Sequence, residues 1–175
     1  MKNNPVVIIN GDPKSTFNEI LIKTLKKKVF KQFKFPIIII CSKNLFTHEL
    51  KKFKTKLNFQ NFDAQDILNN NNIYIFDIPL DYKNLSLNKK NAYIKKSFDM
   101  GLNLLKKNKS MALINGPISK TTFLKGKYKG ITEFLAFKTR STNEVMLIFN
   151  KELSVSPITT HIPINEVTKK IKKKT

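Results

Sequence analysis

The sequence has little of several features on which whole classes of protein depend. Its 175 residues include a single cysteine, Cys41, at the end of the apolar run 37–40. One cysteine excludes an internal disulfide framework and agrees with a reducing compartment, so we expect a cytoplasmic protein with Cys41 buried. No stretch approaches the ~18 consecutive apolar residues of a membrane-spanning helix. The apolar run 6–9 is too short for the core of a signal peptide.

Glycine and arginine are also scarce. None of the five glycines stands in a G-x-G-x-x-G pattern, so a dinucleotide would have to be bound without that fingerprint. Arg140 is the only arginine although the formal net charge is +21, and base readout and bidentate phosphate contacts favour arginine. The lysines are spread along the chain together with Asn, Ile and Phe, whose codons are A/T-rich. A base-composition bias therefore explains the charge better than a nucleic-acid partner does.

The apolar residues, 41% of the chain, are enough for a buried core. They form short continuous runs, which are typical of strands buried on both faces of a parallel sheet that helices cover. We expect one partial α/β unit over residues 1–175, and an internal boundary is considered near residues 80–90. Predicted strands lie at 6–10, 36–41, 73–76, 111–115, 145–149 and 155–159. Predicted helices lie at about 15–33, with Ser15 as N-cap, at 45–56 and 89–107, and from near Pro163.

Three polar clusters stand where predicted strands end: Gly11-Asp12-Pro13, Gly116-Pro117-Ile118-Ser119-Lys120 and Thr159-Thr160-His161-Ile162-Pro163. Ligands of α/β sheets bind where such strand ends converge. The first two clusters also have a purely structural explanation as strand-to-helix turns, in which glycine supplies conformational freedom and proline fixes the turn. As a ligand site, the second cluster offers Lys120 as a cation for a phosphate.

Two single residues carry alternative roles. Thr132 opens the segment 134–137, where it either caps a helix or contacts an anion at a helix N-terminus. His161 either makes a structural hydrogen bond or binds a metal in the crevice. A metal site needs about three protein ligands, and the other histidine, His48, is expected on the surface of a helix. The residues alone therefore leave the function open.

The order of the clusters, with Gly130-Ile131-Thr132-Glu133-Phe134-Leu135-Ala136 between the second and the third, resembles the N-terminal half of the 4-hydroxythreonine-4-phosphate dehydrogenase family. The resemblance implies a three-layer α/β/α fold with a mixed, largely parallel sheet, similar to isocitrate and isopropylmalate dehydrogenases and here incomplete. It also implies a homodimer that oxidises and decarboxylates 4-phosphohydroxy-L-threonine in vitamin B6 biosynthesis. The implied cofactors are NAD and a divalent metal (Zn, Mg, Mn or Co) held by three histidines.

By this resemblance His161 is the first metal ligand and Thr132 contacts the phosphorylated substrate, while no residue is assigned a catalytic role. Ile131 stands where the family has a substrate-binding histidine. The other two metal histidines belong to a half that the sequence lacks, so we expect inactivity of the chain alone and an exposed apolar surface. The partner would be a second copy or a complementary C-terminal half. Two alternatives stay open: a non-catalytic binding or scaffold domain that keeps the fold, and a basic nucleic-acid-binding domain.

Overall fold

The computed structural model describes residues 4–27, 33–63, 65, 68–107, 112–142, 144–159 and 162–171. The chain divides into two compact units, Met1–Phe123 and Leu124–Thr175. Residues 80–90, considered above as a boundary, lie inside the first unit, and their role as a domain boundary of a complete enzyme stays a prediction. Within the described ranges no helix is both long and apolar enough to cross a membrane.

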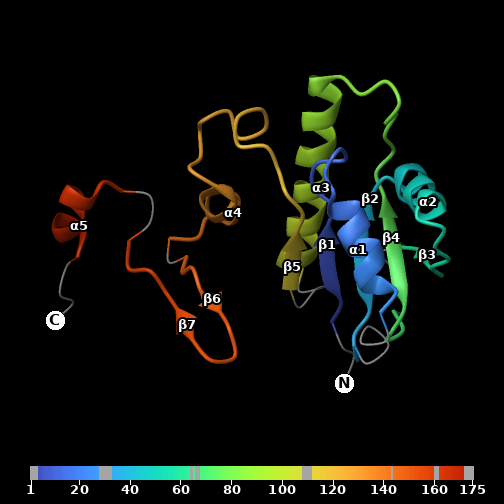
Figure 1. Cartoon of the computed structure of the whole chain (residues 1–175), viewed down its shortest axis with the longest axis horizontal. Helices are drawn as coiled ribbons and strands as arrows, with labels where there is room; N and C mark the ends of the chain where they lie inside the picture. The colour runs from blue at the N-terminus through green and yellow to red at the C-terminus, as the bar shows by residue number, and fades with distance from the viewer. Residues whose placement is uncertain are drawn as a thin grey trace. The chain divides into compact units, whose positions relative to one another are not determined.

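The first unit is an α/β sheet, as predicted (Figure 1). Five strands lie in the order β3-β4-β2-β1-β5, and every pairing between them is parallel. The elements are β1 (Val6–Ile9), α1 (Phe17–Leu25), β2 (Ile37–Cys41), α2 (Lys43–Lys52), β3 (Gln60–Asn61), β4 (Ile73–Asp77), α3 (Leu87–Lys106) and β5 (Ala112–Asn115).

Helices cover both faces of this sheet, because alternate residues of its continuous apolar strands point to opposite sides. Ile8 and Ile39 join one core cluster with residues of α1 and α2, such as Leu21 and Phe46. On the other face α3 approaches so closely that a Cβ on Gly101 would lie 2.8 Å from Ile9 Cδ1. The unit therefore has three layers, with α1 in front of the sheet and α3 behind it in Figure 1.

The helices differ from their predicted bounds at the ends. The helices α2 and α3 each begin two residues before the predicted start. Their N-caps are Ser42 and Ser86, whose hydroxyls accept the N–H groups of Leu45 and Lys89. The N-cap of α1 is Thr16, so the prediction of Ser15 was wrong by one residue. The helix α1 also ends early, at Leu25, the last position buried against the sheet before two exposed lysines.

The two edges of the sheet are unlike the centre. Strand β3 was not predicted, because Gln60 and Asn61 are exposed and polar and carry no apolar signal. Strand β5 pairs with β1 alone among the described strands, so it is an edge strand of the first unit's sheet. Its burial is correspondingly poor: Ala112 is exposed and Ile114 is 49% exposed.

The second unit is small and contains α4 (Ile131–Thr139), β6 (Ile148–Phe149), β7 (Ser154–Val155) and α5 (Ile164–Lys170). Phe134 and Ala136 of α4 are buried, and the ring of Tyr128 lies 5.4 Å from that of Phe134. The strands β6 and β7 form an antiparallel hairpin. The predicted long, buried strands at 145–149 and 155–159 are thus reduced to two residues each, because no described strand extends this hairpin into a larger sheet.

The hairpin exposes a group of large apolar side chains, which we call the hairpin surface. The exposed fractions reach 73% for Phe149 and 76% for Val145, against 0% for Ile38 to Ile40 in β2. The expected exposed apolar surface is therefore confirmed. Contiguous exposed apolar area of this size is uncommon on a monomeric protein. Its members are Val145, Leu147, Ile148, Phe149, Leu153 and Val155.

Candidate functional site

The turns that follow β1 and β5 meet at one edge of the first unit. The N–H of Asp12 donates to Pro117 O at 2.8 Å, and the N–H of Gly116 donates to Ile9 O at 2.7 Å. Gly11 has φ +73°, and a Cβ there would lie 2.5 Å from Pro117 O. Glycine at position 11 is therefore required both by the backbone conformation and by the close approach of the second turn.

The carboxylate of Asp12 is occupied within the protein. Its Oδ1 accepts the N–H of Lys14 and its Oδ2 lies 2.9 Å from Lys90 Nζ, which comes from the first turn of α3. Both side chains of this ion pair are about one-seventh exposed, at 15% and 14%. The turn therefore presents backbone groups and exposed side chains to a ligand, while the carboxylate of Asp12 holds the turn to α3.

The neighbour of Lys90 holds the second turn. Asn91 Nδ2 donates to Thr122 O at 2.9 Å, so adjacent residues of α3 fasten both strand-end turns. Near this edge, the buried atoms Asn10 Oδ1, Asn91 Oδ1 and Thr122 Oγ1 have no hydrogen-bond partner among the residues that the structure describes. Buried polar atoms are nearly always paired, so these three mark positions for water or a ligand group.

Lys120, the cation proposed for a phosphate, is exposed at the rim of the second turn. It forms no ion pair with any residue that the structure describes. No sequence signal singles out Lys90 and Asn91, because they are two polar residues in a lysine-rich amphipathic helix. Only the fold shows that they reach the strand ends.

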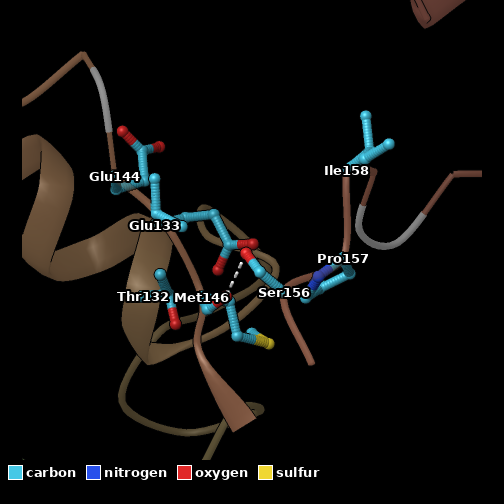
Figure 2. Close-up of a pocket in the computed structure, with 8 residues that line it drawn as sticks. Thr132, Glu133, Glu144, Met146, Ser156, Pro157 and Ile158 are labelled. Atoms are coloured by element: carbon cyan, nitrogen blue, oxygen red, sulfur yellow. Dashed lines mark hydrogen bonds between the residues drawn. The ribbon is translucent and has the colours of Figure 1, made fainter. Parts of the chain in front are cut away.

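Thr132 lies in the second unit, in the first turn of α4. The N-cap of this helix is Gly130, in extended conformation, so the capping role considered for Thr132 was wrong. Thr132 instead lines a cavity of about 390 Å³ together with Glu133, residues 144–146 and residues 156–158 (Figure 2). The hydroxyl of Ser156 donates to Met146 O at 2.8 Å and ties the two chain segments of the cavity together.

The chemistry of this cavity combines a hydroxyl with two carboxylates. Figure 2 shows the Glu133 side chain directed toward Ser156, while the Glu144 carboxylate points away from it. The positive end of α4 attracts an anion, but Glu133 and Glu144 oppose one. Hydrogen-bond donors such as an ammonium or a hydroxyl group fit the carboxylates and Thr132 better.

His161 and Thr160 lie outside the described residues, so the metal-ligand prediction for His161 stays a prediction. In the described part of the chain no three side chains of His, Cys, Asp or Glu come together as a metal site. His48 is on α2 in the first unit with 54% of its side chain exposed, which confirms the expected surface position. The described residues alone therefore do not make a metal centre.

Comparison with known proteins identifies the family to which the chain belongs. The family model of the pyridoxal phosphate biosynthetic protein PdxA matches residues 32–175. A 4-hydroxythreonine-4-phosphate dehydrogenase of Sulfurihydrogenibium sp. (strain YO3AOP1) is 28% identical over 173 residues, which cover 96% of this chain and 53% of the relative. The Aquifex aeolicus enzyme of the same name is 26% identical and is covered to 54%. The chain thus spans about half the length of the curated relatives it matches.

Solved structures agree on the fold. A 4-hydroxythreonine-4-phosphate dehydrogenase from Burkholderia phymatum superposes with a TM-score of 0.79 at 22% identity, over 97% of this chain and 54% of that one. A putative enzyme of this name from Salmonella typhimurium gives the same TM-score at 20% identity and is covered to 55%. Together with the parallel sheet, these matches confirm the predicted incomplete α/β/α fold.

Proposed function

Because the chain belongs to the pyridoxal phosphate biosynthetic protein PdxA family, we propose that it supplies the N-terminal half of a 4-hydroxythreonine-4-phosphate dehydrogenase. The complete enzyme would oxidise and decarboxylate 4-phosphohydroxy-L-threonine with NAD and a divalent metal in vitamin B6 biosynthesis. The observation that carries the proposal is the match over nearly the whole chain to about half of each relative. A cytoplasmic location, as expected from the single cysteine, is part of the same proposal.

The cavity beside Thr132 supports a role in substrate binding. The substrate carries an ammonium and one free hydroxyl group, which donate hydrogen bonds, and the cavity presents the acceptors Thr132 and Glu133. We propose that Thr132 orients the substrate by one such bond. Orientation of this kind lowers the barrier of the chemical step only when the reacting groups are present as well.

The metal is proposed to bind His161, with two further histidines supplied by the C-terminal half that the family resemblance implies. A bound metal would supply Lewis acidity toward the substrate hydroxyl. The expected partner is therefore a complementary C-terminal half, in an assembly with two copies of this chain. The hairpin surface is the apolar area that such a partner would cover.

A chimaera tests the proposal. The C-terminal half of the Sulfurihydrogenibium relative is fused after Thr175, and NADH formation from 4-phosphohydroxy-L-threonine is measured by absorbance. We expect no turnover by the 175-residue chain and turnover by the chimaera. His161→Ala should abolish that turnover, whereas Lys169→Ala, a matched change at an exposed residue of α5, should leave it intact. Vigorous NADH formation by the chain alone would refute the proposal.

A non-catalytic scaffold is the second candidate, and Ile131 is the observation that favours it. Ile131 begins α4 directly beside Thr132, and its side chain cannot donate or accept a hydrogen bond. If the chimaera is a true enzyme, Ile131→His should raise kcat/KM about tenfold, the effect of one hydrogen bond to a charged substrate. A folded chimaera that stays inactive with either residue would establish the scaffold instead.

A further inference from the structure

A second cavity lies in the first unit, and its lining includes no residue of the strand-end turns of β1 and β5. Its volume is about 670 Å³, within the range of small-molecule sites. One wall is a face of α2 and the other is the loop that follows β4, so the cavity stands at the carboxyl ends of two neighbouring parallel strands. The lining residues are Lys43, Asn44, Thr47, His48 and Lys51 from α2, and Leu80, Asp81, Tyr82 and Lys83 from the loop.

Helix α2 presents two different faces. Leu45, Phe46 and Leu50 are buried in the core, and the residues at spacing 43, 44, 47, 48 and 51 line the cavity. The side that faces the loop is therefore polar along two turns of the helix. Because the buried face packs α2 against the sheet, the backbone of the helix holds the polar residues in position at the cavity.

The cavity is positively charged. Three lysines line it, against the single acidic residue Asp81. Lys51 and Lys83 make no ion pair with any described residue, and Lys43 Nζ donates at 2.9 Å to the neutral amide oxygen of Asn61. Among the described carboxylates, none forms an ion pair with any of the three ammonium groups. Thr47 and Asn44 add neutral hydrogen-bond donors between them.

The loop is attached to α2 at the cavity. The rings of His48 and Tyr82 lie 5.4 Å apart at an interplanar angle of 42°, a contact between the two walls. The backbone N–H of Lys43 donates to Asp77 Oδ1 at 2.9 Å, and that of Ile78 donates to Cys41 O. These bonds join the ends of β2 and β4, so the cavity has a fixed frame on both sides.

We propose that this cavity binds a ligand that carries phosphate groups, through Lys43, Lys51 and Lys83. Lysine binds phosphate as a point charge, and three lysines in one cavity suit a group with more than one negative charge. This site shares no residue with the strand-end turns or with the cavity beside Thr132. It does not depend on the proposed dehydrogenase function.

The test compares two double variants of the full chain that lose the same charge. Lys51→Gln with Lys83→Gln alters the cavity, and Lys95→Gln with Lys96→Gln alters two exposed residues of α3. Calorimetric titration uses inorganic pyrophosphate at physiological ionic strength, where the Debye length is about 8 Å and diffuse charge effects are weak. We expect the cavity variant to lose about tenfold in affinity and the control to lose less than about twofold.

A measurement on the unaltered chain guards against misfolded variants. Pyrophosphate should slow acetylation of Lys43, Lys51 and Lys83, followed by mass spectrometry, and leave Lys95 and Lys96 unaffected. A short single-stranded deoxythymidine oligonucleotide identifies the phosphate source. If it displaces pyrophosphate and needs the same lysines, the site binds a nucleic-acid backbone; if it does not, the ligand is a small phosphorylated molecule. Equal losses in both double variants, or no selective protection, would overturn the proposal.

Discussion

Strand β2 and the hairpin of β6 and β7 have similar apolar sequences and opposite surroundings. Every residue of β2, from Ile37 to Cys41, is at most 4% exposed, because sheet neighbours and helices enclose it. Ile148 and Phe149 of β6 are 61% and 73% exposed. The difference teaches that a continuous apolar run predicts a strand that is buried in a complete fold. The apolar run does not tell whether the residues that bury the strand belong to the same chain.

The largest expected contrast comes from removing one phenylalanine ring in each region. Phe46 is fully buried in the core cluster of the first unit, so Phe46→Ala should lower the free energy of unfolding by about 3–5 kcal/mol. Phe149→Ala on the hairpin surface should change it by less than about 0.5 kcal/mol. Urea unfolding followed by circular dichroism measures both. A cost above about 1.5 kcal/mol for Phe149→Ala would mean that the hairpin is already covered in solution.

Two glycines with positive φ, one in each unit, extend the comparison of the two units to the backbone. An alanine at Gly126 of the second unit, with φ +69° and nothing within 4 Å of the added Cβ, should cost about 1–2 kcal/mol for the left-handed conformation alone. At Gly11 the same strain is joined by a contact of 2.5 Å with Pro117 O, which forces the two turns apart. We expect Gly11→Ala to cost at least about 1 kcal/mol more than Gly126→Ala. Equal costs in urea titrations would show that the turns separate easily.

Cys41 is 1% exposed, which confirms its predicted burial. From this residue we expect a smaller, pH-dependent effect on the free energy of unfolding. Burial, with the charge of Asp77 as a lesser cause, raises the pKa of the Cys41 thiol. The folded chain then keeps the thiol protonated while the unfolded chain ionises above about pH 8.5, so stability is full below that pH and falls above it. Raising the pH to about 9.5 should lower the free energy of unfolding by about 1.4 kcal/mol, and Cys41→Ala should remove this dependence.

Most of the first unit could be predicted from sequence because its signals are local. The runs at 37–41 and 73–76 are apolar throughout, and the serines before α2 and α3 are ordinary helix caps. The helix bounds were harder to predict. Lys54, for example, takes φ +48° just after α2 and ends the helix before the predicted residue 56. A left-handed lysine carries no signal in the sequence.

The two turns of the candidate site could be predicted from the sequence, whereas the side-chain contacts that hold these turns in place could not. Gly11 and Gly116 stand out in a chain with five glycines, and the fold brings both to one edge. The ion pair between Asp12 and Lys90 joins residues 78 positions apart, and only the crossing of α3 over the sheet makes it possible. The cavity between α2 and the loop after β4 was missed for the same reason, because its two walls come from different elements.

The position of β5 at an edge of the sheet has a consequence for how this chain behaves at high concentration. Unpaired peptide groups on an edge strand are a template on which another copy adds its own strand, the first step of aggregation. The formal net charge of +21 opposes that step, because two copies repel each other at low ionic strength. Added salt screens the repulsion and leaves the edge unprotected. The abundant lysines thus act as a colloidal stabiliser for a sheet with an edge strand at β5, and the chain should precipitate as salt rises.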